Sequence, residues 1–241
     1  MTYCIGIKTN DGLVFASDSR TNAGLENVNI YSKMLTHDVG DRTIVIVTSG
    51  NLGTSQAVYK SIEKDLKSST GIMNLNTCGD FEQIASYVGS LNIEHSSPQG
   101  INTDNVLLGS TFIVGGQIKG QGHELYLVYP QGNYIRPADS KPYLVIGEVK
   151  YGKPILDRVI TPDVSIGDAS RCALISMDST LKSDLTVGPP IDIAVFKKDE
   201  KKISYLKCLN TSDNDYTMIC ETWSNKVLQA FDTFPKFDWE K

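Results

Sequence analysis

The order in which strand and helix signals follow one another limits the architecture of this chain more than any other feature. Two predicted hairpins come first, each with a glycine-containing turn between its strands. Their strands cover residues 3–8, 13–18, 34–37 and 43–48. Helical spacing of apolar residues then follows over residues 54–66 and again from Asp80, which is a good N-cap with Gln83 three positions later.

The same alternation continues through the second half of the chain. Further predicted strands cover residues 111–114, 124–129, 134–135, 143–146, 191–197 and 202–209. Helical spacing recurs over residues 154–160, 168–181 and 216–231, whereas the polar residues 95–109 indicate a loop. Turns of hairpin length make neighbouring strands antiparallel, and paired helices disfavour a doubly wound parallel sheet. We therefore predict an α+β fold, a four-layer αββα sandwich with two antiparallel sheets between helix pairs.

The chain shows no linker that would divide it. Its 241 residues suit one large domain, so we expect a single domain over residues 1–241. A C-terminal helix and aromatic tail occupy about residues 213–241. We expect most of the tail aromatics to make ordinary packing contacts and the final ones to be available to a neighbouring subunit.

Composition excludes several classes of function. The net charge of −5 argues against nucleic acid or an anionic membrane as the main partner, because both require clustered basic surface. The longest aliphatic run, residues 44–47, is too short to cross a bilayer, and the N-terminus does not resemble a signal peptide. Five scattered cysteines and three distant histidines form no metal motif, so we expect no metal or cofactor, free thiols and a cytoplasmic location.

Thr2 is the first residue with candidate chemistry. Removal of Met1 is expected before a small side chain, and it would give Thr2 a free α-amine beside its own hydroxyl. An N-terminal amine, with an ordinary pKa of roughly 7.7–8.0, is a known activating base for a Thr hydroxyl. The first hairpin places Thr2 opposite residues 19–21, near Asp18 at the end of an apolar strand. Taken singly, each of these residues has an ordinary explanation. Thr2 is a small residue at the second position of the chain, Asp18 ends a strand, and Lys33 is a solvated lysine.

As an ordered set, these residues resemble a known family. Residues 2–8 (TYCIGIK), 11–20 (DGLVFASDSR), Lys33 and 48–50 (TSG) look like the N-terminal third of a proteasome β-subunit. The chain is more closely similar to the bacterial proteasome-like family Anbu (ancestral β-subunit). Segments 15–24 (FASDSRTNAG) and 146–157 (IGEVKYGKPILD) look characteristic of that family, and the likeness covers essentially the whole chain.

The resemblance implies an N-terminal nucleophile (Ntn) hydrolase with specific residue roles. Thr2 would be the nucleophile, and Lys33, held by Asp18, would lower the pKa of its amine or hydroxyl. The backbone N–H of Gly50 would donate to an oxyanion, and Thr21 would offer backbone hydrogen bonds to an extended substrate. The resemblance also implies a homo-oligomer, as a ring or an open spiral. No motif indicates an ATPase partner.

Two departures from the proteasome pattern concern the supporting residues. Proteasome β-subunits carry a serine after the glycine that matches Gly147, where this chain has Glu148. In their Asp-x-x-Ser-Gly arrangement, Asp184 matches but Val187 stands at the serine position, and Thr186 could substitute with a one-residue shift. Glu148, with Lys150 and Tyr151, is either part of a new site or part of a solvated strand-to-helix loop.

Three functions therefore stay open. The first is a proteasome-type threonine peptidase or amide hydrolase that uses Thr2 within a homo-oligomer and acts on a peptide or another amide. The second is an oligomeric scaffold or peptide-binding assembly whose catalytic network has decayed. The third is a hydrolase of small or modified amides, such as γ-glutamyl conjugates. The third is favoured by the family tendency to be encoded near ATP-grasp ligase and transglutaminase-like proteins.

Overall fold

The first hairpin lies in the middle of one of two stacked sheets. The computed structural model describes residues 1–22, 28–68, 71–96 and 108–240. In the first sheet the order is β10 (Tyr143–Gly147), β1 (Tyr3–Thr9), β2 (Gly12–Asp18), β11 (Ile191–Lys197) and β12 (Tyr205–Leu209), all antiparallel. In the second the order is β5 (Met34–Val39), β6 (Arg42–Gly50), β7 (Ser110–Ile118), β8 (Glu124–Val128) and β9 (Tyr134–Ile135), also antiparallel.

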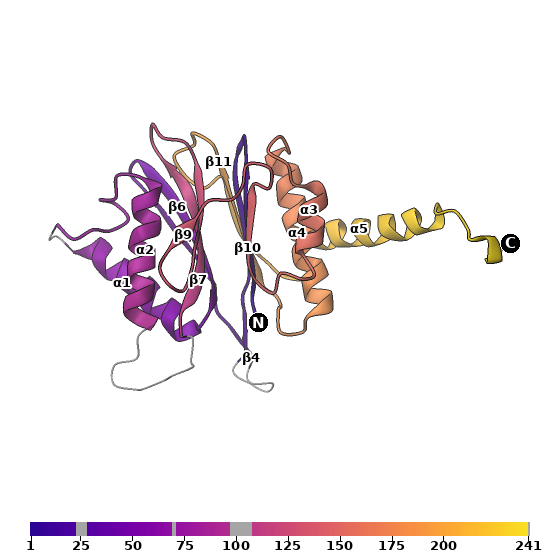
Figure 1. Cartoon of the computed structure of the whole chain (residues 1–241), viewed down its shortest axis with the longest axis horizontal. Coiled ribbons are helices and arrows are strands. Elements are labelled where there is room, and N and C mark those ends of the chain that lie inside the picture. Colours follow the sequence, from indigo (N-terminus) through magenta and orange to yellow (C-terminus); the bar gives the residue numbers. More distant parts are fainter. Residues whose placement is uncertain (23–27, 69–70, 97–107, 241) are drawn as a thin grey trace.

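Helix pairs cover the two outer faces of the sandwich (Figure 1). Helices α1 (Leu52–Lys67) and α2 (Phe81–Ser96) pack on the second sheet, and α3 (Lys153–Val159) and α4 (Ile166–Ser183) pack on the first. The four-layer αββα architecture predicted from the order of hairpins and helix pairs is therefore confirmed. In the described part of the chain, none of these helices combines the length and apolar character that crossing a membrane requires.

Strands β1 and β2 are buried along almost their whole length because they are covered on both faces. Ile5 and Ala16 point to the layer of α3 and α4, whereas Cys4 and Phe15 point into the space between the sheets. Both faces are buried, so the usual alternation of polar and apolar residues is lost. A fully buried side chain such as Phe15 contributes about 1.5–3 kcal/mol relative to an exposed one. At the end of this hairpin away from its turn, β2 ends at Asp18 and β1 is preceded by Thr2, so the two residues lie at the same end of the sheet.

Local capping explains where the helices begin. The Asn51 side chain accepts from the Thr54 backbone N–H at 3.1 Å, so α1 starts before the residues whose periodicity predicted it. Asp80 accepts from the Gln83 backbone N–H at 2.8 Å, as the capping pattern predicted. Ser165 caps α4 through the backbone N–H of Asp168.

Several predicted boundaries are wrong. The last strand of the first sheet begins at Tyr205 rather than at residue 202, because residues 198–204 form a longer connection in which Asp199 has a positive φ of 64°. A short hairpin, β3 (Arg20–Asn22) with β4 (Val28–Ile30), was not predicted. Residues 95–96 of the predicted loop belong to α2, and residues 97–107 lie outside the described residues.

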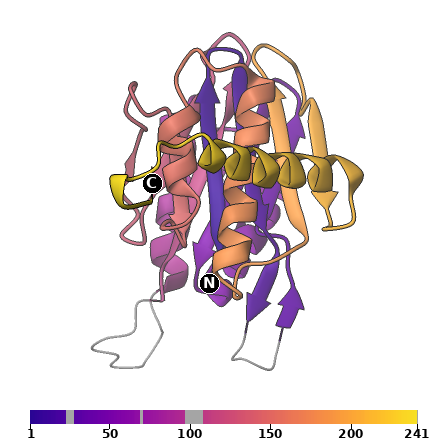
Figure 2. The ribbon, with the colours of Figure 1, turned by 90° about the vertical axis from the view of Figure 1, so that its right-hand side faces the viewer.

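The C-terminal helix α5 (Asn214–Asp232) does not join either helix layer over its full length. Its first half packs against α4, and the rest extends away from the sandwich (Figure 1). Seen from the side of the α3–α4 layer, it crosses in front of that layer (Figure 2). Tyr216 and Cys220 anchor its first half. Phe231, Phe234, Phe237 and Trp239 are 62–80% exposed. The prediction of ordinary packing is therefore wrong for Phe231, whereas the final aromatics are exposed, as an availability to a neighbouring subunit requires.

Candidate active site

Asp18 and Lys33 form a buried ion pair at one end of the sandwich. The Lys33 Nζ atom lies 2.7 Å from Asp18 Oδ1, and the side chains are 5% and 0% exposed. The same Nζ atom donates to the Arg20 carbonyl oxygen at 2.7 Å. Sequence reasoning named both residues, and the structure brings them together.

The Asp18 carboxylate is fixed by the backbone as well as by Lys33. Oδ1 accepts from the Tyr3 N–H at 3.0 Å and Oδ2 from the Gly188 N–H at 3.3 Å. Burial raises the pKa of the Asp18 carboxyl above its usual value, and the charge of Lys33 and these hydrogen bonds offset part of the rise. The contact with Tyr3 ties the pair to the residue that follows Thr2.

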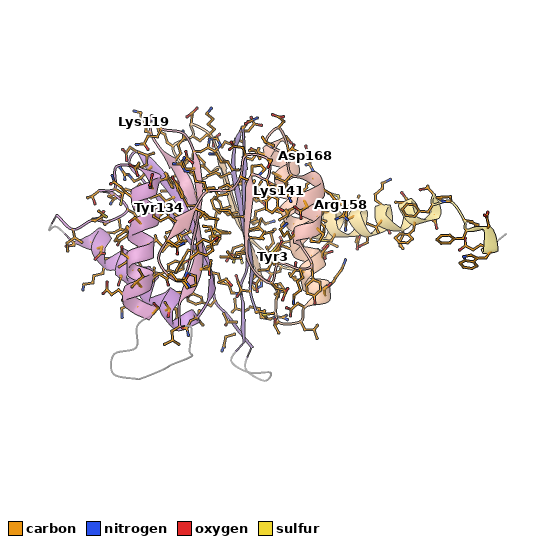
Figure 3. All side chains as sticks on the ribbon, viewed as in Figure 1. Tyr3, Lys119, Tyr134, Lys141, Arg158 and Asp168 are labelled. Atoms are coloured by element: carbon orange, nitrogen blue, oxygen red, sulfur yellow. The ribbon has the colours of Figure 1, made fainter. Side chains whose placement is uncertain are left out.

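Tyr3 is itself held from the opposite side. Its hydroxyl lies 2.8 Å from the Ser176 hydroxyl on α4. Figure 3 shows Tyr3 between the first sheet and the α3–α4 layer. The backbone at the start of β1 is therefore fixed both by Asp18 and by the helix layer.

Thr2 and Lys33 line one cavity of about 350 Å³. The cavity is also lined by Met1, Arg20, Thr21, Thr48, Ser49, Gly50, Leu52, Ser55 and Gly147. Within the described part of the chain, its lining includes two cationic side chains and several hydroxyls but no carboxylate. Thr2, Lys33, Gly50 and Thr21, which were predicted from four separate segments, thus meet at one hollow.

The backbone of Thr2 is fixed by the strand on its other side. The Glu148 N–H donates to the Thr2 carbonyl oxygen at 2.7 Å. Gly147 has φ +88°, and a Cβ atom there would lie 1.9 Å from that oxygen. Only glycine fits this position without moving Thr2.

Gly50 ends β6 one residue before the cap of α1. Its φ is +117°, and a Cβ atom would lie 3.1 Å from the Gly109 carbonyl oxygen. Strand and helix therefore meet in a tight turn at the cavity wall, next to backbone N–H groups of a helix start. Below the turn, the Ser55 hydroxyl lies 3.0 Å from the Thr48 hydroxyl and 2.9 Å from the Ser110 hydroxyl, which makes the wall rigid.

Thr21 lies in the unpredicted β3–β4 hairpin at the edge of the cavity. Its hydroxyl donates to the Asn29 carbonyl oxygen at 3.1 Å. Neighbouring Arg20 donates to the Leu185 carbonyl oxygen at 2.7 Å. The hairpin therefore connects the cavity to the segment that contains Asp184.

Asp184 and Thr186 form a local pair. Asp184 Oδ1 accepts from the Thr186 hydroxyl at 2.6 Å and from its N–H at 2.8 Å. Burial pushes the pKa of Asp184 upward, but the bonds from Thr186, the Met1 amine and the charge of Lys150 outweigh it, so the pKa is lowered. Val187 is buried in the core beside α4. The structure thus pairs Thr186 with Asp184, although neither lines the cavity in the described residues.

Glu148 is not part of a solvated loop. It is 5% exposed, and its Oε1 accepts from the Lys150 N–H at 3.3 Å and lies 3.8 Å from Lys150 Nζ. Of the two interpretations, the solvated loop is therefore wrong for Glu148, whereas Lys150 and Tyr151 are exposed. Glu148 contacts Thr2 through its backbone, and its side chain is outside the cavity lining.

Asp192 is a site-proximal residue that sequence reasoning missed. Its Oδ2 atom accepts from the hydroxyls of Ser19 and Ser32, the neighbours of Asp18 and Lys33. The sequence feature that could have identified Asp192 is that it is a lone aspartate in the apolar strand Ile191–Lys197.

The described residues contain no group of three or more His, Cys, Asp or Glu side chains that could hold a metal ion.

Comparison with known proteins agrees with this geometry. The family model described as Proteasome subunit matches residues 2–196. The curated proteasome subunit beta of Haloquadratum walsbyi is 24% identical over 209 residues, which cover 84% of this chain and 76% of that protein. That of Methanocaldococcus jannaschii is 24% identical over 205 residues and 84% of each chain.

Solved structures are more similar still. Anbu (ancestral beta-subunit) from Yersinia bercovieri is 35% identical with a TM-score of 0.91 and covers 98% of this chain and 99% of its own. Anbu from Hyphomicrobium sp. strain MC1 is 37% identical with a TM-score of 0.89 and covers 98% and 99%. The Anbu complex of Pseudomonas aeruginosa, described as a helical assembly, is 37% identical with a TM-score of 0.89 and covers 98% of each chain. The chain belongs to the proteasome subunit family and, within it, to the Anbu proteins.

Proposed function

We propose that this protein is an N-terminal threonine hydrolase that cleaves amide bonds within a homo-oligomer. The observation that carries the proposal is the buried Asp18–Lys33 pair, with Nζ 2.7 Å from Oδ1, beside a cavity that Thr2 and Gly50 also line. A buried ion pair is costly unless it is well placed, and here its positive residue, Lys33, lines the same cavity as the candidate nucleophile. Removal of Met1 frees the Thr2 amine.

The proposed reaction uses Thr2 as both nucleophile and base. The Thr2 hydroxyl attacks the amide carbonyl while its proton passes to the Thr2 amine, and the Gly50 N–H stabilises the oxyanion. The C–N bond then breaks and the amine returns the proton to the leaving nitrogen, which leaves an ester on Thr2. Water attacks the ester, its proton passes through the amine to the Thr2 oxygen, and the acid product departs. Lys33 lowers the pKa of the attacking group through its charge.

The substrate is held by the backbone in this proposal. Thr21 supplies hydrogen bonds to an extended peptide, which adds to the hairpin like a strand. In this proposal Asp184 and Thr186 support the site from the neighbouring segment, and Thr186 substitutes for the missing serine with a one-residue shift. The hydrogen bond that the Thr186 hydroxyl donates to Asp184 supports this role. Glu148 supports it through the backbone bond to Thr2.

Two alternatives have specific support. A decayed scaffold is supported by Val187, which is buried at the position where proteasome subunits carry a serine. A hydrolase of small or modified amides, including γ-glutamyl conjugates, is supported by the small volume and cationic lining of the cavity. Both alternatives keep the oligomer.

The homo-oligomer, as a ring or an open spiral, is supported by the exposed aromatics beyond α5. Exposed apolar side chains on and beyond a projecting helix favour association with a second copy of the chain.

A reducing compartment such as the cytoplasm is supported by the five free cysteines, four of which are buried.

Intact mass spectrometry before and after treatment with a peptide epoxyketone tests the proposal. The reagent needs a hydroxyl and a free amine on the same residue, so an adduct on Thr2 requires Met1 removal and a competent nucleophile together. We expect one adduct on the wild-type chain and none on Thr2→Ala. Loss of Met1 without an adduct would favour the scaffold.

A further inference from the structure

We propose that Asp192 is a positioning residue that holds Lys33 against Asp18 by tying together the segments that carry them. The kinetic part of this inference rests on the proposed function of Thr2, whereas its structural part does not. Asp192 is outside the cavity lining in the described residues, so it acts through its neighbours and not on the substrate.

The Asp18–Lys33 pair needs such a tie because it joins two different sheets. Asp18 ends β2 in the first sheet, and Lys33 directly precedes β5 in the second. The distance between Nζ and Oδ1 therefore depends on how the two sheets are held at this end of the sandwich. No covalent turn fixes that distance, because residues 19–32 lie between them.

Asp192 supplies the connection from the first sheet. Its Oδ2 atom accepts from the Ser32 hydroxyl at 2.7 Å and from the Ser19 hydroxyl at 3.0 Å. Ser32 precedes Lys33 and Ser19 follows Asp18, so one carboxylate oxygen is bonded next to both members of the pair.

The second sheet holds the same segment from the opposite side. The Lys33 carbonyl oxygen accepts from the Tyr59 hydroxyl at 2.9 Å and from the Thr48 N–H at 3.1 Å. On the side of the first sheet, Tyr31 also donates its N–H to the carbonyl oxygen of Ser19, which follows β2, at 2.8 Å. With Asp192 in place the segment is fixed from both sheets, and without it the tie through the Ser32 side chain is lost.

The surroundings of Asp192 fit a structural carboxylate. It lies opposite Ser17 on β2 and Cys208 on β12. Burial, together with a hydrogen bond to Asp192, raises the pKa of the Cys208 thiol. The Ser17 hydroxyl is fully buried and, within the described part of the chain, has no hydrogen-bond partner, which leaves Ser19 and Ser32 as the hydroxyls that occupy Oδ2.

The test compares rates of epoxyketone capture by Thr2 in Asp192→Ala, Asp192→Asn and Ser32→Ala. We expect Asp192→Ala to slow capture by about 10–100-fold, since a displacement of about 1 Å can cost 100-fold. Because both hydroxyls bind one oxygen, the amide oxygen of Asp192→Asn can accept both and should restore the rate to within about threefold. Asp38→Ala is the matched control, since Asp38 also accepts two hydrogen bonds but at the far end of β5.

The pattern separates positioning from general stability. If Asp192 acts through Ser32, Ser32→Ala slows capture in the wild-type background and has little further effect in Asp192→Ala. Equal slowing in Asp38→Ala, or no rescue by Asp192→Asn, would overturn the proposal. The same holds if Asp192→Ala captures the reagent at the wild-type rate.

A crystal structure of Asp192→Ala tests the placement without relying on activity. We expect the Lys33 Nζ atom to move away from Asp18 Oδ1, and the segment at Ser32 to shift with it. An unchanged 2.7 Å contact would refute the inference even if Thr2 proved inert. An inert wild-type Thr2 with a displaced Lys33 in the variant would instead refute the proposed hydrolase and keep the positioning role.

Discussion

Lys33 Nζ donates to Asp18 Oδ1 at 2.7 Å although the two residues lead into different sheets. The only other acceptor recorded for this Nζ atom among the described residues is the Arg20 carbonyl oxygen. The pair thus lies where the two sheets meet, and the distance between its two atoms depends on how the sheets are stacked. This relationship leads to the first prediction.

Asp18→Ala should destabilise the protein by about 3–5 kcal/mol, because it leaves a buried ammonium without its partner. It should also abolish capture of an epoxyketone by Thr2. Urea unfolding followed by fluorescence measures the first effect and intact mass the second. Arg171→Ala, which removes the exposed pair with Asp168, is the control and should cost less than about 1 kcal/mol. Similar losses in both variants would contradict the assignment of a buried, essential pair.

Gly147→Ala should displace Thr2, because a Cβ atom at Gly147 would lie 1.9 Å from the Thr2 carbonyl oxygen at φ +88°. We expect a loss of at least about 1–3 kcal/mol from backbone strain and slower capture at Thr2. Gly122→Ala is the control, since nothing lies within 4 Å of its added Cβ. Thermal unfolding and capture kinetics together make the comparison. Wild-type behaviour of Gly147→Ala would show that the strand can move freely there.

Thr186→Val should raise the pKa of Asp184 toward its ordinary value, because it removes the hydroxyl that donates at 2.6 Å. NMR titration of the Asp184 carboxyl carbon measures the change. If the pair supports the proposed hydrolase, Thr186→Val should also slow capture at Thr2. A raised pKa with an unchanged capture rate would restrict Thr186 to a local structural role.

His123 should make stability depend on pH. Burial, with the nearby charges of Lys8 and Lys198, lowers the pKa of His123 below the usual value of about 6.5. As pH falls through about 6.5 the unfolded chain takes up a proton that the folded chain excludes, so stability falls. His123→Gln removes this titration and should flatten the dependence between pH 7 and 5. The free energy of unfolding of the wild-type protein and of His123→Gln, measured at both pH values, tests this prediction. The same change with pH in both proteins would contradict it.

Replacing Phe234, Phe237 and Trp239 together by Ser should reduce the size of the assembly and leave the thermal stability of the subunit almost unchanged. These side chains are 62%, 65% and 80% exposed, so the isolated subunit gains little from them. Light scattering after size-exclusion chromatography measures the mass. Val39→Ser, which alters an exposed apolar residue on the sandwich, should leave the mass unchanged. An unaltered mass in the triple variant would place the subunit contacts elsewhere.

Local patterns were enough to predict the layers of the fold. The turn at Asn10-Asp11-Gly12 and the apolar run of β2 produce the central hairpin, whose observed register runs from Thr9 opposite Gly12 to Cys4 opposite Ser17. Asp80 and Gln83 marked the start of α2 because capping is a local interaction. The β3–β4 hairpin was missed because its strands are three residues each, which is too short for a period to stand out.

The site was partly predictable for a similar reason. Asp18 and Lys33 were identified from the family resemblance, and their contact depends on the stacking of two sheets, which no local pattern describes. The burial of Glu148 and the role of Asp192 depend on which segments cross at this end of the sandwich. Side chains that are held by distant segments leave no period in the sequence.

Met1 shares its cavity with Thr2, Lys33 and Gly50. In the proposed hydrolase, a residue that precedes Thr2 would therefore occupy the volume that the substrate needs and would convert the Thr2 amine into an amide. A purification tag at the N-terminus would block the site in two ways, because it would fill the cavity and would remove the free amine of Thr2. The first residue of each preparation should therefore be identified before its activity is measured. If residues still precede Thr2, a lack of activity shows only that the N-terminus has not been processed.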